Sequence, residues 1–344
     1  MTQTRQPWLI AVAGAALLAL ALFATLQGVT QIGAVEALRA LLSPILPSSW
    51  SADLVPQDVA ILTRLRLPRT LLAAIAGASL AAAGVAMQGI TRNPLVSPYT
   101  IGISPAASFG ACLAILAMGE RGLSGQVMLV GAAFVSALVC AVLVLGLASL
   151  RGISGTVLVL AGVGLSYLFG ALTSTLQFIA TEQQLAVIVH WAFGSVNGAT
   201  WDGVLVTGMV LAACLPVLLA QAWALNAFAA GGDEVAASLG FAVMRTRVTV
   251  TLASVLMTAA VVSFAGVIGF VGLIAPHVGR LLVGGDHRRL LPFAAIVGAG
   301  LLLLADLAGR LLFAPVTVPV GIVVAYLGVP LFLHLLLRPR GRAS

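Results

Sequence analysis

Lysine is absent from this sequence of 344 residues, so all 17 of its basic side chains are arginines. A phosphate-binding loop of the form G-x-x-x-x-G-K-[ST] requires a lysine, and so does a Schiff base with retinal or pyridoxal phosphate. The sequence therefore excludes a P-loop ATPase and a Schiff-base enzyme. If ATP drives this protein, a partner must hydrolyse it.

Charge and cysteine are also scarce. Only 8% of the residues are charged, and the three cysteines are Cys112, Cys140 and Cys214. Their odd number and spacing match no disulfide or metal pattern, and the four histidines show no ligand spacing. We expect no metal site, no cofactor, and cysteines that act as small buried hydrophobic residues.

Hydrophobic residues, by contrast, make up 61% of the chain, and its mean hydropathy is +1.14. A helix crosses the roughly 30 Å of membrane hydrocarbon with about 20 apolar residues. About ten such runs occur, at 8–28, 70–90, 100–118, 126–149, 157–180, 204–222, 247–266, 268–283, 291–311 and 319–337. The sequence predicts an all-α polytopic membrane protein with a single transmembrane domain over residues 1–344. The short runs on either side of Gly266–Gly269 would form one broken helix or two helices.

Arginine placement predicts the orientation, because short cytoplasmic loops carry an excess of basic residues. With both termini in the cytoplasm, the inner arginines are Arg5, Arg92, Arg151, Arg245, Arg247, Arg280, Arg288, Arg289, Arg338, Arg340 and Arg342. The outer ones are Arg39, Arg64, Arg66, Arg69, Arg121 and Arg310. Residues 29–69 then form an outer loop and residues 223–244 the longest inner loop. Topology explains the net charge of +7, so a nucleic-acid partner is unnecessary.

Two connections between the runs have unusual composition. The outer loop ends with Arg64, Arg66 and Arg69 on the side that disfavours arginine. These side chains would either anchor a helix at the membrane surface or bind carboxylates of an acidic partner protein. On the inner side, the prolines and Asn93 of residues 91–98 force irregular backbone at membrane depth, as either a simple connector or a constriction in a pathway.

Polar and small residues form a stripe along one face of the fifth run. They are Ser166, Gly170, Thr173, Ser174, Gln177 and Thr181. Such a stripe either joins helices together or lines a pore.

Acidic residues mark two further positions. Asp233 and Glu234 are expected to open a short helix that Gly240 ends, as a docking surface or as a solvated loop. In the ninth run, Asp306 and Arg310 have the spacing of an ion pair on one helix face. A carboxylate within the membrane is also a candidate for proton transfer.

Several motifs then occur in a fixed order. They are Arg66-Leu67-Pro68-Arg69, Gln88 with Asn93-Pro94-Leu95, Gly266-x-x-Gly269-Phe270-Val271-Gly272-Leu273-Ile274-x-Pro276-His277-x-x-Arg280, Asp286-His287-Arg288, Leu304-Ala305-Asp306 with Arg310, and Pro319-Val320-Gly321-Ile322. As an ordered set, they resemble the FecCD-type permeases, which are the membrane subunits of bacterial ABC importers for iron–siderophores, haem and vitamin B12. The resemblance covers residues from about 60 to 338.

The resemblance implies ten helices per subunit and one pathway between two permease subunits, which are identical or paralogous. The other partners would be two cytoplasmic ABC ATPase subunits and an extracytoplasmic substrate-binding protein. The residues that would dock the binding protein are Arg66, Arg69 and Arg310. Those of the cytoplasmic gate would be Asn93, Leu95, Ser154, Gly155 and Thr156, with Gly155 in place of the family's threonine. Those that would border the pathway are Ser166, Gly170, Thr173, Ser174 and Gln177. Those that would contact the ATPases are Asp233, Glu234, Ser238, Leu239 and Gly240.

The resemblance and the residues together predict a function. We expect a permease subunit, without enzyme activity, of an ABC importer in the bacterial inner membrane. It would move an iron–siderophore-type chelate by alternating access, with haem or cobalamin as the alternative cargo. The alternative of another class is a proton-coupled transporter that uses Asp306. An intramembrane enzyme is disfavoured, because no H-E-x-x-H motif and no nucleophile–base pair occurs.

Overall fold

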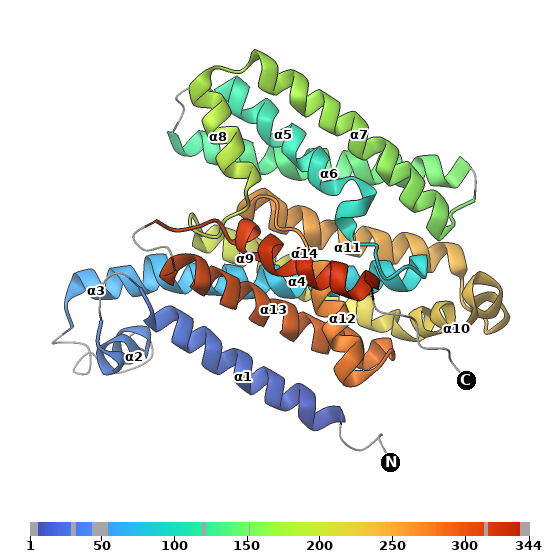
Figure 1. The fold of residues 1–344 in the computed structure, drawn as a ribbon, viewed down its shortest axis with the longest axis horizontal. Helices are drawn as coiled ribbons and strands as arrows, with labels where there is room; N and C mark the ends of the chain where they lie inside the picture. The colour runs from blue at the N-terminus through green and yellow to red at the C-terminus, as the bar shows by residue number, and fades with distance from the viewer. Residues whose placement is uncertain are drawn as a thin grey trace.

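The computed structural model describes residues 6–28, 32–42, 54–118, 122–150, 152–312 and 316–337, and regular structure in these ranges is helical (Figure 1). The elements in chain order are α1 (Gln6–Leu26), α2 (Ala34–Leu42), α3 (Pro56–Ala60), the π-helix η2 (Ile61–Arg66), α4 (Leu67–Thr91), the 3₁₀ helix η3 (Pro98–Ile101), α5 (Ile103–Met118), α6 (Gly122–Leu150), α7 (Gly155–Ile179), α8 (Glu182–Ala192), α9 (Trp201–Ala220), α10 (Ala222–Ser238), α11 (Val243–Ala265), α12 (Val271–Val283), α13 (His287–Leu311) and α14 (Val320–Leu337).

Seven of the described helices are long and apolar enough to cross a membrane. They are α1, the continuous helix Pro56–Thr91, α6, α7, α9, α11 and α13. Helices α5, α12 and α14 contain shorter apolar segments. Each of the ten predicted runs matches one of these helices, so the all-α polytopic fold is confirmed.

The runs around Gly266 form two helices. α11 ends at Ala265 and α12 begins at Val271. Between them Gly266 has a φ of 68° and Phe270 a φ of 63°. Because positive φ does not fit a right-handed helix, these two positions separate α11 from α12.

The outer loop predicted over 29–69 is partly helical. It contains α2 and a helix that begins at Pro56 and continues through η2 into α4. The helix that contains the second predicted span therefore begins well before residue 70, because Arg64 and Arg66 interrupt the apolar run without ending the helix. Residues 29–31 and 43–53 of the predicted loop lie outside the described residues.

Helix α4 lies at the centre of the molecule. Most of its residues between Ala76 and Ile90 are buried, and α9, α11, α12 and α13 pack around it. A Cβ atom on Gly77 would clash with the Gly298 carbonyl on α13, and one on Gly298 would clash with Gly77. The two backbones are thus in direct contact, which is how small residues pack helices tightly in membranes.

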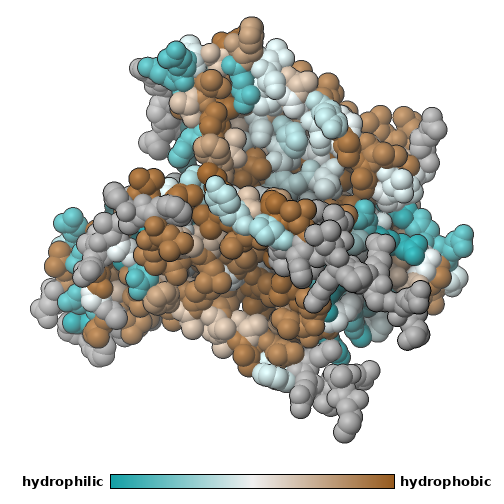
Figure 2. Space-filling model, in the orientation of Figure 1, coloured by the Kyte–Doolittle hydropathy of each residue, from teal (hydrophilic) through white to brown (hydrophobic). Residues whose placement is uncertain are grey.

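The surface has an apolar side and two more polar ends. Hydrophobic residues cover α1 and α13, whereas hydrophilic residues gather toward the ends of the molecule (Figure 2). One end, here called the α3 end, carries α2 and α3; the other, the α10 end, carries α10, the start of α1 and the end of α14 (Figure 1). Six arginines that support the predicted orientation lie outside the described residues, namely Arg5, Arg121, Arg151, Arg338, Arg340 and Arg342, so the sidedness of the termini stays a prediction.

Candidate functional site

Helix α10 consists of two parts that meet at a bend. The bend is at Gly232, which has a φ of 80° and a ψ of −153°. Asp233 follows directly and lies in the first turn of a short helix, where a carboxylate is stabilised by the helix dipole. The helix ends before Gly240, which has a φ of 85° and donates its N–H to the Ala237 carbonyl at 2.9 Å. The predicted short helix is therefore present, and residues 233–240 are called the coupling segment below.

The coupling segment presents one set of side chains outward and one inward. Four of the five residues predicted to contact the ATPases are exposed, namely Glu234, Ser238, Leu239 and Gly240. Leu239 is 63% exposed, although it lies at a polar end of the molecule. The fifth residue, Asp233, points inward to an arginine on α11. The segment therefore has an available surface and an internal attachment.

The internal attachment is Arg247, near the start of α11. Its side chain is almost completely buried, and its guanidinium binds both carboxylate oxygens of Asp233, at 2.7 and 2.5 Å. The same guanidinium donates to the Ile153 carbonyl and lies over the Phe228 ring, 5.3 Å from its centroid. One side chain therefore contacts both parts of α10 and the turn that precedes α7.

The turn before α7 contains one of the two predicted gate elements. Ser154 caps α7 by accepting a hydrogen bond from the Val157 N–H at 3.2 Å. Gly155 is buried against the end of α4, where a Cβ atom on it would lie 2.8 Å from the Thr91 Cα. Thr156 is exposed. Glycine at position 155 thus allows the backbones of α7 and α4 to meet, which a threonine in this arrangement would prevent.

The other predicted gate element follows α4 directly. Arg92 ends that helix with a φ of 53°, and the Asn93 side chain accepts a hydrogen bond from the Leu95 N–H at 2.9 Å. Leu95 is 46% exposed. A Cβ atom on Gly232 would lie 2.7 Å from the Arg92 guanidinium. Both gate elements therefore lie beside the bend in α10, and the backbone of residues 91–98 is irregular as predicted.

A second polar cluster attaches α10 to α13. Asn226 donates to Asp286 at 2.8 Å and accepts from the His287 N–H at 2.9 Å. Arg288 pairs with Asp286 at 2.6 Å and lies over the Trp223 ring, 4.0 Å from its centroid. The hydrogen bond from Arg288, with help from Asn226, holds the pKa of Asp286 well below its ordinary value of 3.8. The Asp286 carboxylate, which links α10 to α13, therefore stays charged at neutral pH.

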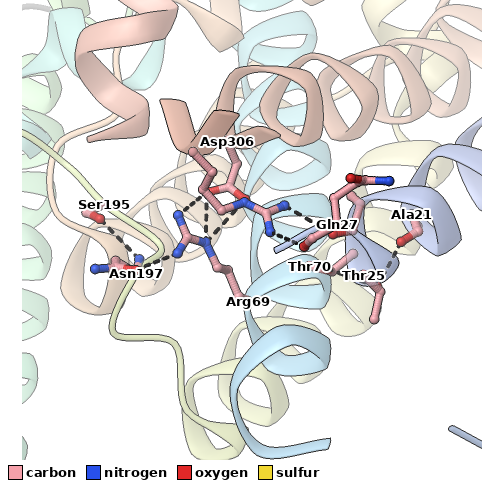
Figure 3. A network of polar contacts seen from close by, with 10 residues as sticks. Ala21, Thr25, Gln27, Arg69, Thr70, Ser195, Asn197 and Asp306 are labelled. Carbon is pink, nitrogen blue, oxygen red and sulfur yellow. Dashed lines mark hydrogen bonds and ion pairs between the residues drawn. The ribbon is translucent and has the colours of Figure 1, made fainter. Parts of the chain in front are cut away.

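At the α3 end, one carboxylate binds two of the predicted docking arginines (Figure 3). Asp306 is only 3% exposed; Arg69 from α4 donates to it at 2.8 and 3.0 Å, and Arg310 pairs with it at 3.1 Å. Arg69 also donates to Asn197 at 2.5 Å. The ion pair predicted between Asp306 and Arg310 is confirmed, and the structure adds Arg69 and Asn197 to it. These four residues are called the Asp306 cluster.

The third predicted docking arginine also has internal partners. Arg66 is buried and donates to the Leu26 carbonyl at 2.8 Å, and Arg310 donates to the Gln27 carbonyl at 3.0 Å. Both carbonyls lie at the end of α1, where no further helical turn is available to bind them. Arg64, by contrast, is exposed on η2. The predicted docking arginines thus hold α1, α4 and α13 together.

The stripe residues that lie inside α7 make their hydrogen bonds within that helix. Ser166 donates to the Gly162 carbonyl at 2.8 Å and Thr173 donates to the Phe169 carbonyl at 2.7 Å. Exposed or half-buried positions on the same stripe are Gly170, Ser174 and Gln177. Thr181, at the end of the stripe, caps α8 by accepting a hydrogen bond from the Gln184 N–H at 3.3 Å. Among the described residues, the stripe side chains inside α7 make no hydrogen bond to another helix, so within one subunit only Thr181 supports the helix-joining role.

Some of the residues that organise these clusters were not predicted. Asn197 and Asn226 lie in sequence without any distinguishing pattern. Arg247 carries a signal, because a charged residue inside an apolar helix has to be paired when it is buried. Across the described ranges, no three His, Cys, Asp or Glu residues are grouped closely enough to hold a metal ion.

Known proteins are similar to this chain in sequence and in fold. The sequence matches the model of the FecCD transport family over residues 9–338. It is 39% identical to the hemin transport system permease protein HmuU of Yersinia pestis, over 81% of this chain and 84% of the relative. It is also 39% identical to the cobalamin import system permease protein BtuC of Halobacterium salinarum, over 85% of this chain and 79% of the relative.

The fold is similar to that of a solved transporter. That structure is described as an inward-facing conformation of a metal-chelate type ABC transporter. The two chains are 33% identical and superpose with a TM-score of 0.83. The match covers 96% of this chain and 99% of the solved one.

Proposed function

This chain belongs to the FecCD transport family and is a multi-pass permease of an ABC importer, and from that premise we propose that it moves an iron–siderophore-type chelate into the cytoplasm by alternating access. In this proposal a second permease subunit, identical or paralogous, completes the pathway. Two ATPase subunits bind the α10 end on the cytoplasmic side, where both termini lie. A substrate-binding protein delivers the chelate at the α3 end.

The observation that carries the proposal is the direct connection between the coupling segment and the gate elements. The exposed face of the segment, with Glu234 and Leu239, is available to an ATPase. Its inward face reaches the Ile153 turn through Asp233 and Arg247. Nucleotide binding can shift the permease between two states only if the ATPases bind those states with different affinity. If the coupling segment moves together with the gate, it presents a different surface to the ATPases in each state, and their affinity for the two states then differs.

The residues proposed to line the pathway are of types that would bind the cargo only weakly. The stripe on α7 offers hydroxyl and amide groups, and it contains no charged side chain. A neutral surface does not compete with the binding protein for an anionic chelate, so release into the cytoplasm is easy. The metal-chelate type transporter with the same fold supports this cargo class. Haem and cobalamin stay the alternative cargoes, because the hemin and cobalamin relatives are equally identical to this chain.

The α3 end is the proposed docking surface of the binding protein. Arg69 and Arg310 are only 13% and 11% exposed, so they act mainly through the positive potential that they create there. Reversing Arg66 and Arg69 to Glu would place a carboxylate beside Asp306 and disturb the fold. Arg64 is exposed and is the better position to test.

The docking test measures the affinity of the binding protein for the reconstituted permease at low ionic strength. We expect Arg64→Glu to weaken binding and to flatten its salt dependence, because the attraction is electrostatic. Arg245→Glu is the matched control, since Arg245 is exposed near the α10 end. Equal affinities of the two variants would remove Arg64 from the docking surface.

The function test uses the permease purified with its ATPase subunits, reconstituted in vesicles, and supplied with the binding protein. A ferric siderophore, haem and cobalamin are offered separately, with and without ATP. We expect ATP-dependent uptake of the ferric siderophore. Uptake of only haem or cobalamin would reassign the cargo. Uptake that follows a proton gradient without ATPase subunits would overturn the proposal in favour of a proton-coupled carrier; the two guanidiniums bound to Asp306 argue against that role.

A further inference from the structure

We propose that Arg247 is the positioning residue that transmits the movement of the coupling segment to the gate turn, residues 153–156. The inference rests on the proposed function, because it presumes that an ATPase moves the coupling segment. It adds a residue for which the sequence motifs predicted no role. Arg247 lies on α11, outside both the coupling segment and the gate elements.

The contacts of Arg247 reach three separate parts of the chain. Its guanidinium binds Asp233 with two hydrogen bonds, of 2.7 and 2.5 Å, and also donates to the Ile153 carbonyl. The exposed fraction of Arg247 is only 4%, so its guanidinium has little access to water, although the Asp233 side chain is 46% exposed. A charged hydrogen bond is strong there, and an unpaired guanidinium would be costly. Asp233 and Ile153 are therefore expected to move together.

The position of the Arg247 guanidinium beside the bend indicates how movement would pass from the coupling segment to the gate turn. Phe228 lies before the bend at Gly232 and Asp233 lies after it, and Arg247 contacts both. Phe228 is fully buried, so the part of α10 before the bend is fixed in the protein. A force on the exposed face of the coupling segment therefore changes the angle at Gly232. Arg247 passes that change to the Ile153 carbonyl and so to Gly155, which rests against Thr91.

Only arginine can make this set of contacts. Its planar guanidinium offers a fork to Asp233, a further donor to the Ile153 carbonyl and a flat face to Phe228. Lysine keeps the charge but presents one ammonium group without a planar face. We expect Arg247→Lys to lower the amount of chelate imported per ATP hydrolysed by about tenfold, which corresponds to the loss of one charged hydrogen bond.

The experiment uses the complete complex of permease, ATPase subunits and binding protein in proteoliposomes. Uptake and ATP hydrolysis are measured in the same vesicles for wild type, Arg247→Lys and Asp233→Asn. Arg245→Lys is the matched control, because Arg245 is an exposed arginine two positions away on the same helix. Co-purification of the ATPase subunits reports assembly. If Arg247→Lys does not assemble, Asp233→Asn carries the test, since Asp233 is 46% exposed and the change is nearly isosteric.

A second readout follows the gate itself. Thr156 is exposed, whereas Cys112, Cys140 and Cys214 are buried. A Thr156→Cys variant can therefore be labelled with a membrane-impermeant thiol reagent. We expect ATP to change the labelling rate in the wild-type background but not with Arg247→Lys. A purely structural role of Arg247 would alter assembly or melting without abolishing this response to ATP.

The outcomes separate this inference from the proposed function. Low uptake per ATP and a labelling rate insensitive to ATP, both restricted to the Arg247 and Asp233 variants, support the link. The link is overturned if an assembled Arg247→Lys or Asp233→Asn complex imports as much chelate per ATP as the wild type and its labelling rate responds to ATP as the wild type's does. If the wild-type complex shows no ATP-dependent uptake of any chelate, the proposed function itself has failed.

Discussion

Replacing Asp306 with asparagine tests whether the Asp306 cluster stabilises the α3 end. The substitution keeps the size of the side chain and removes the negative charge that Arg69 and Arg310 share. Both arginines are mostly buried, at 13% and 11% exposure, so water can compensate only a small part of the loss. Removing one partner of a buried ion pair costs about 3–5 kcal/mol. We expect the lower end of that range, because Arg69 and Arg310 keep other hydrogen-bond partners.

The protein supplies its own reporter for this measurement. Cys112, Cys140 and Cys214 are all buried and free, so a thiol-reactive dye becomes fluorescent only when the protein unfolds. For a chain of 344 residues, a loss of about 3 kcal/mol corresponds to a melting temperature lower by about 4 °C. Asp202→Asn is the control, because Asp202 is exposed in the first turn of α9 and its removal should cost only the roughly 0.3–1 kcal/mol of a surface helix-dipole interaction.

A double variant tests the physical reason for that loss. In Asp306→Asn with Arg69→Met, one of the two stranded guanidiniums is also removed. We expect the double variant to melt above the level that adding the two single effects predicts, because the residues are in direct contact. If Asp306→Asn melts like the Asp202 control, or the effects simply add, then the cluster does not hold these helices by its charges.

Two other predictions concern the α10 end. Gly155→Ala should lower stability by about 1–3 kcal/mol, because the new Cβ atom would lie 2.8 Å from the Thr91 Cα. Gly164→Ala is the control in the same melting assay, because Gly164 lies on the same helix and a Cβ atom there meets no atom within 4 Å. For Asp286, whose folded-state pKa is depressed, the stabilisation is fully present above its ordinary pKa of 3.8 and is lost only as the pH falls through the lower folded value. Wild-type melting between neutral pH and about pH 5 should therefore not reflect this group, and a difference between wild type and Asp286→Asn that shrinks over that interval would contradict the assignment.

Much of the membrane architecture can be predicted from sequence, because a span has to be apolar over its full length. All ten runs correspond to helices, and the Asp306–Arg310 pair follows from its i, i+4 spacing. The helix around the second run extends beyond the apolar residues that predict a span, since arginines can lie inside a helix when the fold supplies buried partners. Arg66 does so by bonding the end of α1, which is distant in the sequence.

The tertiary contacts of the candidate site could not be predicted in the same way. The charge of Asp233 and its place in an inner loop predicted a residue on the surface, but its carboxylate is bound by Arg247 from another helix. Likewise, the docking role proposed for Arg69 did not reveal that Asp306 binds it. Charge and exposure are separate properties, and only the packing of α4, α10, α11 and α13 decides which charged residues face a partner. The docking, gating and coupling roles stay proposals that the experiments above address.

The meeting of Gly155 and Thr91 has a consequence for how α4 and α7 can move relative to each other. Because two stretches of main chain form the contact, no side-chain rotation can relieve it. In the proposed transport cycle, the two helices would therefore separate only as rigid bodies, so that any movement at this point would also displace the far ends of α4 and α7.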